Sequence, residues 1–106
     1  MVTRELIYQF RDRIVNGFDP EKIILFGSHA YGELSIDSDV DVLVILSFEG
    51  KSARKSAEIL VQTDPHFPTD LIVRTPEQVR DRVAKGDFFL KEILERGEVL
   101  YERTHS

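Results

Sequence analysis

Two short segments of this sequence carry residues that could do chemistry together. Gly27 and Ser28 follow an apolar run, and Asp39 and Asp41 come after ten intervening residues. A glycine that ends a strand and a serine that opens a helix leave backbone N–H groups and a hydroxyl available to an anion. Two carboxylates on one face of a strand repel each other, and Mg²⁺ accepts such oxygen ligands together with substrate phosphates. This combination predicts phosphoryl or nucleotidyl transfer.

A third carboxylate is expected on a neighbouring strand, because two-metal chemistry uses several acidic ligands. Asp70 directly precedes the apolar run Leu71–Val73 and is the preferred candidate. Asp64, which lies in a proline-containing loop, is the weaker one. Gly32 has no Cβ, so a bulky ligand could approach the backbone there.

Two other phosphate or metal motifs are excluded by single residues. Glu33 and Leu34 stand where a P-loop requires lysine and serine or threonine. Asp37 begins an alternation of aspartates like that of a calcium loop, but Val42 and Phe48 replace the glycine and the glutamate that such a loop requires. Both alternatives are therefore rejected.

The composition is that of one small globular domain, residues 1–106. Hydrophobic residues make up 42% and charged residues 31%, which excludes an intrinsically disordered chain. The chain has no cysteine, which excludes disulfides and zinc–thiolate sites. Its net charge of −5 disfavours stable binding to nucleic acid. No apolar run approaches the ~20 residues that span a bilayer and no signal peptide is recognisable, so a cytoplasmic location without membrane attachment is expected.

The pattern of apolar residues predicts the elements that must position these side chains. The run Val40–Leu46 is apolar on both alternating faces, which indicates a central strand covered on both sides. Thr75-Pro-Glu-Gln78 is a helix-start pattern. The remaining predictions are helices over Thr3–Phe18, Lys51–Gln62 and Phe88–Arg96, with strands at Lys22–Phe26, Leu71–Val73 and Val99–Tyr101.

These elements predict a small α/β (α+β) domain. Its mixed sheet would have about four strands, with helices packed mainly on one face. The inward face of the helix over Lys51–Gln62 is expected to carry Ala53, Ala57, Leu60 and Val61. Of the two adjacent aromatic residues in the last helix, Phe89 is expected in the core and Phe88 at a partner contact.

The combined motif resembles the nucleotidyltransferase signature of the polymerase-beta superfamily. Gly27-Ser28, ten residues, Asp39-Val40-Asp41 and the later Asp70 are spaced as in that signature. The chain is most similar to the minimal nucleotidyltransferases, or MNT proteins, which are often MntA-like antitoxins encoded with HEPN-domain toxins. The likeness extends to a Gly-x-Val-Leu-Tyr pattern at residues 97–101. The family often has arginine where this chain has His29 and Tyr31.

The resemblance implies the polymerase-beta-like nucleotidyltransferase fold and a role for each motif residue. Asp39 and Asp41 would bind two Mg²⁺ ions, and Asp70 would be the third ligand and the general base. Gly27 and Ser28 would bind the nucleotide phosphates. The donor would be an NTP, ATP above all, and the acceptor a hydroxyl.

The acceptor is expected on another polypeptide, because sheet and helices use the whole chain and leave no second lobe to hold it. A HEPN-type toxin is the partner that the resemblance implies. Two alternatives stay open: a small-molecule nucleotidyltransferase of the aminoglycoside type, and a non-catalytic antitoxin that acts by binding alone. The sequence leaves the oligomeric state open.

Overall fold

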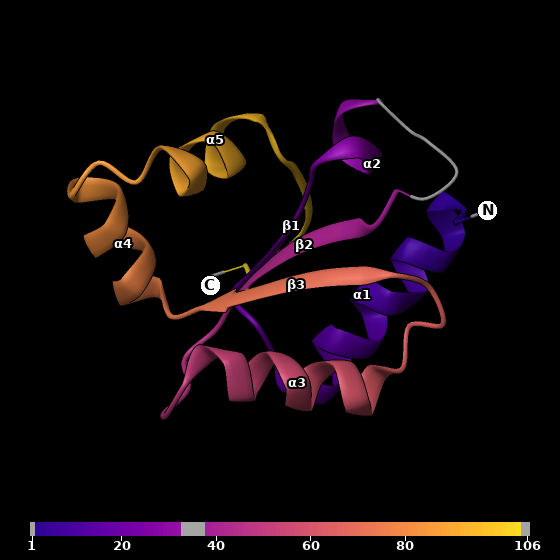
Figure 1. Cartoon of the computed structure of the whole chain (residues 1–106). Coiled ribbons are helices and arrows are strands. Elements are labelled where there is room, and N and C mark those ends of the chain that lie inside the picture. Colours follow the sequence, from indigo (N-terminus) through magenta and orange to yellow (C-terminus); the bar gives the residue numbers. More distant parts are fainter. Residues whose placement is uncertain (1, 33–37, 105–106) are drawn as a thin grey trace.

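A computed structural model describes residues 2–32 and 38–104, which form five helices and one four-stranded sheet (Figure 1). Asp37 lies outside these described residues. Within the described part of the chain, no helix is long and apolar enough to span a bilayer. The elements are α1 (Arg4–Phe18), β1 (Lys22–Phe26), α2 (Ser28–Tyr31), β2 (Val40–Ile45), α3 (Ser52–Thr63), β3 (Thr69–Arg74), α4 (Pro76–Ala84), α5 (Phe88–Arg96) and β4 (Glu98–Glu102).

The sheet is mixed and its strand order is β3-β2-β1-β4. β1 pairs antiparallel with both β2 and β4, whereas β2 and β3 are parallel. A parallel pair needs a crossover connection, and α3 supplies it. The expectation of a central strand at Val40–Leu46 is confirmed, because β2 lies between β1 and β3.

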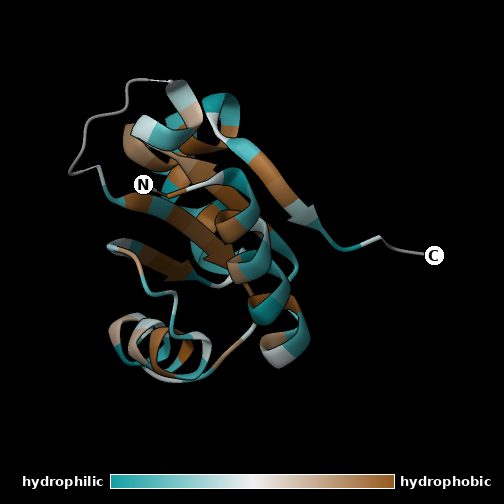
Figure 2. Ribbon diagram, turned by 90° about the vertical axis from the view of Figure 1, so that its right-hand side faces the viewer, coloured by the Kyte–Doolittle hydropathy of each residue, from teal (hydrophilic) through white to brown (hydrophobic). Residues whose placement is uncertain are grey.

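Alternation along the strands divides the apolar core into two layers. Side chains such as Val42 and Val44 pack with α1 and α3 on one face of the sheet. Leu43 and Ile45 pack with α4 and α5 on the other. In Figure 1, α1 and α3 lie on one side of the strands and α4 and α5 on the opposite side, while Figure 2 shows how hydrophobic the strands between them are.

The predicted fold class and mixed sheet are confirmed, but the arrangement of helices differs in one respect. The two longest helices do share one face, yet α4 and α5 cover the other, so the helices are not gathered mainly on one side. The reason is that both faces of the inner strands are apolar and each must be buried.

The predicted inward face of α3 is confirmed only at Leu60, which is partly buried against the core. Ile59 and Thr63 are buried, whereas Val61 is 80% exposed and Ala53 and Ala57 are also exposed. The Thr63 hydroxyl donates to the Ile59 carbonyl at 2.6 Å. A short polar side chain can therefore face the core here, since its hydrogen bond is made locally.

Local hydrogen bonds mark the starts of α1 and α4, and the start of α4 at Thr75 confirms the sequence prediction. The Thr3 hydroxyl accepts from the N–H of Leu6 at 3.2 Å at the start of α1. At the start of α4, Thr75 and Gln78 form a reciprocal capping box with bonds of 3.1 and 3.0 Å. These caps fix the residue at which each of the two helices begins.

Candidate active site

The parallel pairing of β2 and β3 brings Asp41 and Asp70 side by side. The two residues are register partners, so their side chains leave the sheet on the same face. Asp41 alternates with Leu43 and Ile45, which places both carboxylates on the face covered by α4 and α5. The sequence suggested that Asp70 directly precedes the strand, whereas in the structure it is the second residue of β3.

Gly27 lies against the carboxylate of Asp41. Phe26 at the end of β1 is the register partner of Asp41, and Gly27 follows it with a φ of 69°. A Cβ at Gly27 would overlap Oδ2 of Asp41. Glycine is therefore required twice here, by the positive φ and by the closeness of the carboxylate.

Asp39, Asp41 and Asp70 interact electrostatically at the ends of β2 and β3, and the pKa of Asp41 is shifted. Burial raises the pKa of Asp41 above its usual value, and the charges of Asp70 and Asp39 raise it further. The ring of His29 opposes this shift. Asp39 and Asp70 are exposed, whereas Asp41 is partly buried. A carboxylate held among like charges favours a proton or a metal cation.

The short helix α2 begins beside these carboxylates. The Gly27 carbonyl accepts from the N–H groups of Ala30 and Tyr31 at 3.0 Å each. Among the described residues, no hydrogen bond uses the N–H groups of Ser28 and His29, which begin α2 directly after Gly27. Gly32 ends the helix with a φ of 80° and has open space where a Cβ would lie.

A pocket of about 320 Å³ contains three of the predicted site residues, Gly27, Asp41 and Asp70. Asp39, Ser28 and Gly32 adjoin it in sequence but do not line it. Its other walls come from β1, α2 and α5, and they are Phe26, Tyr31, Phe89, Glu92 and Ile93.

The aromatic pair in α5 differs from the expectation. Phe89 is 54% exposed and is not a core residue; its ring meets Phe26 edge-on at 5.8 Å and lines the pocket. Phe88 is 79% exposed, on the surface next to it. The pocket thus combines carboxylates with an aromatic wall, which suits a planar, charged ligand such as a nucleotide.

Sequence reasoning missed the polar residues that α5 contributes. Glu92 lines the pocket and forms an ion pair with Arg96 at 2.9 Å. The guanidinium of Arg96 lies 4.5 Å from the centre of the Tyr31 ring. The i, i+4 spacing of Glu92 and Arg96 predicts a common helix face, but only the packing of α5 against α2 shows that this face meets the site.

The donor set suits a magnesium ion bound jointly with a substrate. Among the residues that the structure describes, no three His, Cys, Asp or Glu side chains are already arranged around a metal position. Mg²⁺ is usually held by one or two carboxylates plus phosphate oxygens rather than by a complete protein cage. The neighbouring carboxylates of Asp41 and Asp70 meet that requirement.

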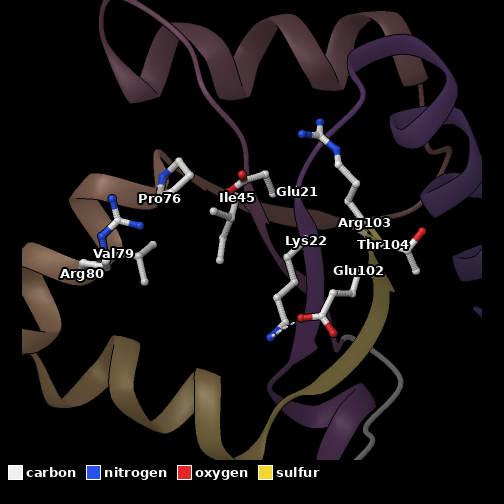
Figure 3. Close-up of a pocket in the computed structure, with 9 residues that line it drawn as sticks. All are labelled: Glu21, Lys22, Ile45, Pro76, Val79, Arg80, Glu102, Arg103 and Thr104. Atoms are coloured by element: carbon white, nitrogen blue, oxygen red, sulfur yellow. Dashed lines mark ion pairs between the residues drawn. The ribbon is translucent and has the colours of Figure 1, made fainter. Parts of the chain in front are cut away.

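A pocket of about 470 Å³ lies at the other end of β1 and β2 (Figure 3). Most of its charged side chains form ion pairs: Lys22 with Glu102 at 3.3 Å, Arg103 with Asp19 at 3.2 Å and Arg80 with Glu77 at 3.8 Å. Charges of both signs therefore alternate here, unlike the group of like charges around Asp41.

Comparison with known proteins identifies the family. The family model described as a nucleotidyltransferase domain matches residues 7–100, a span that includes every predicted site residue. The chain belongs to the nucleotidyltransferase domain family. A search of curated protein sequences found no match to this nucleotidyltransferase domain.

Solved structures share the fold of this nucleotidyltransferase domain at low sequence identity. A candidate nucleotidyltransferase from Sulfolobus solfataricus matches with a TM-score of 0.65 and 19% identity, over 93% of this chain and 79% of that one. A toxin–antitoxin structure with AMP-PNP matches with a TM-score of 0.54 and 18% identity, over 94% and 73%. A mutant of the toxin–antitoxin pair MntA-HpeT, with two aspartates changed to glutamate, matches with a TM-score of 0.53 and 15% identity, over 98% and 76%.

Proposed function

We propose that this domain transfers a nucleoside monophosphate, AMP in the first instance, from an NTP to a hydroxyl of a HEPN-type partner toxin and thereby neutralises it. The observation that carries the proposal is Asp41, a partly buried carboxylate beside Asp70 and Asp39 and against the backbone of Gly27. Such a carboxylate destabilises the metal-free fold, and strongly perturbed carboxylates of this kind are typical of catalytic and ligand-binding sites.

Asp39, Asp41 and Asp70 would hold Mg²⁺ together with the triphosphate. When bound, the metal supplies positive charge to the phosphate oxygens and aligns the reacting groups. The unused N–H groups of Ser28 and His29 would donate to phosphate oxygens. Tyr31 occupies one of the two positions where the family often has arginine. Arg96 of α5, whose guanidinium lies over the Tyr31 ring, would supply a cation there instead.

At the α-phosphorus, the reaction forms one bond and breaks one, and a proton moves from the acceptor hydroxyl. The acceptor oxygen bonds to the α-phosphorus of the NTP, and the bond from that phosphorus to the bridging oxygen of pyrophosphate breaks. Asp70, exposed beside Asp41, would accept the proton of the acceptor hydroxyl. The products are the nucleotidylated acceptor and pyrophosphate.

Two structural neighbours support a protein acceptor. Both are toxin–antitoxin structures, one of them with AMP-PNP. In the other, two aspartates two positions apart are changed to glutamate, a spacing that Asp39 and Asp41 share. Phe88, 79% exposed on the helix that walls the pocket, would contact the partner next to the transfer site.

The test uses the protein, the product of the neighbouring gene, Mg²⁺ and ATP labelled at the α-phosphate. We expect the label to reach the partner, and Asp39→Asn and Asp41→Asn to abolish transfer. Glu49→Gln is the matched control, because Glu49 is exposed and does not line the pocket. ATP labelled at the γ-phosphate should leave the partner unlabelled, which separates nucleotidyl from phosphoryl transfer.

The same variants separate catalysis from inhibition by contact. If the complex forms, no label is transferred, and Asp39→Asn still neutralises the partner, the enzymatic proposal is rejected in favour of binding alone. Label on an aminoglycoside but not on the partner would instead indicate a small-molecule nucleotidyltransferase.

A further inference from the structure

A groove of about 510 Å³ runs along the outer edge of β3, away from the candidate active site. Its floor is four consecutive strand residues, 71–74, and its walls are Ser52, Ala53 and Ser56 of α3 and Arg82 of α4. Figure 1 shows β3 at the edge of the sheet, with α3 along one side and α4 at its end. None of the described residues that line this groove is a carboxylate, although the chain has a net charge of −5.

The backbone of β3 presents donors to this groove. The Arg74 carbonyl accepts from the N–H of Leu46, next to β2, so alternation directs Leu71 and Val73 outward. Their carbonyls already accept internal bonds, from the Ser56 hydroxyl and from the Arg74 guanidinium, at 2.8 Å each. Among the described residues, no hydrogen bond uses the N–H groups of Leu71 and Val73 on this edge. These are roughly 6–7 Å apart, the two-residue repeat of an extended chain.

Two arginines concentrate positive charge in the groove. Within the part of the chain that the structure describes, the one acidic partner of Arg82 is the N-cap residue Asp87, at 3.7 Å. Arg74 has no carboxylate within ion-pair distance among the described residues. Burial lowers the pKa of Arg74, the nearby charge of Arg82 lowers it further, and the charge of Asp87 opposes this shift, so one carboxylate lies near two cations.

The start of α3 also favours a negatively charged ligand in the groove. Its N-cap residue, Lys51, makes no side-chain hydrogen bond to the helix, and the first two helical residues line the groove. Uncapped N–H groups at a helix start attract negative charge. Backbone, side chains and helix terminus therefore all favour a ligand that is anionic and rich in acceptors.

We propose that this groove binds an extended acidic segment of a partner polypeptide. The segment's carbonyls would accept from the N–H groups of Leu71 and Val73, and its carboxylates would pair with Arg74 and Arg82. An extended peptide is favoured over a lone phosphate because the donors are spread along the strand rather than converging on one point. This proposal does not depend on nucleotidyl transfer, because the groove shares no residue with the pocket at Asp41.

The test uses ¹⁵N-labelled protein and an acetylated hexapeptide of alternating valine and glutamate. We expect the peptide to shift the amide resonances of Leu71 and Val73 and to slow their hydrogen exchange. The amide of Ile72, which alternation directs toward β2, should change little. Arg82→Gln should weaken binding about tenfold, because charge-assisted pairs are the stronger ones. Arg54→Gln, which removes the same charge from α3 outside the groove, should leave the affinity unchanged.

Arg82 is suited to this substitution because its side chain is 52% exposed, so the variant should fold. Three results would each overturn the proposal: no amide shift at millimolar peptide, equal binding of a valine–lysine hexapeptide, or equal binding by Arg82→Gln and Arg54→Gln. If inorganic phosphate alone protects the same two amides, the groove is an anion site and the peptide proposal is wrong.

Discussion

Replacing Asp41 by asparagine should stabilise the metal-free protein at neutral pH. The substitution keeps the size and polarity of the side chain but removes a charge that lies beside Asp70 and Asp39. Asp41 makes no ion pair among the described residues, so its charge is not compensated within that part of the chain. A residue kept for function in this way reduces the free energy of unfolding.

The size of the effect follows from the strand register. Neighbouring strands lie roughly 5 Å apart, so the carboxylates of Asp41 and Asp70 are separated by about 6 Å. Two charges at that distance repel by about 0.7–3 kcal/mol for effective dielectric constants between 80 and 20. Asp70 is exposed, and salt roughly halves the interaction, so about 1 kcal/mol is expected. For a domain of this size that is a rise in Tm of about 4–8 °C.

The stability gained by Asp41→Asn should depend on pH, because it comes from the charge of Asp41. Because the pKa of Asp41 is raised in the folded state, the unfolded chain loses this proton first as the pH rises. The wild type therefore loses stability between the usual aspartate pKa and the raised one, and the advantage of Asp41→Asn grows over that range and is then constant. Near pH 4 the two proteins should have nearly equal stability.

Thermal or urea unfolding of the wild type and Asp41→Asn between pH 4 and 8, without divalent cations, measures this difference in stability. Glu49→Gln controls for net charge and should show no such trend. Adding Mg²⁺ should raise the Tm of the wild type and leave that of Asp41→Asn almost unchanged. A variant less stable than the wild type at neutral pH, or a difference independent of pH, would refute the electrostatic argument.

Two further substitutions test the geometry. Gly27→Ala should abolish nucleotide binding and lower the Tm, because its Cβ would overlap the Asp41 carboxylate at a φ of 69°. Gly32→Ala, at a φ of 80° with open space around it, should lose only about 1 kcal/mol of stability from backbone strain. Calorimetry with and without nucleotide measures both effects. Thr75→Ala removes half of the capping box of α4 and should destabilise the protein by about 1 kcal/mol in urea unfolding, whereas Thr75→Ser should retain most of that stability.

Local sequence patterns were sufficient to predict most elements. The helix starts at Thr3 and Thr75 follow from side chains that bond to backbone N–H groups a few residues away. The central position of β2 follows from a run that is apolar on both faces. The error on α3 arose because a hydrophobic stripe was expected, while Thr63 faces the core with its hydroxyl satisfied by Ile59.

The sequence predicted only those site residues that lie within a recognisable motif. Gly27, Asp39 and Asp41 lie close together in sequence, and their spacing alone indicates a common chemistry. Glu92 and Arg96 are too far along the chain for any local pattern to associate them with it, and they reach the site because α5 packs against the same sheet face.

By itself, the sequence determined which residues could do chemistry and which segments are helix or strand, because caps, turns and alternation act over a few residues. Only the tertiary structure decided that Asp70 is the register partner of Asp41, and that Arg74 and Arg82 share a groove at the edge of β3. Strand pairing and helix packing bring together residues tens of positions apart, and the burial of both sheet faces selects that arrangement.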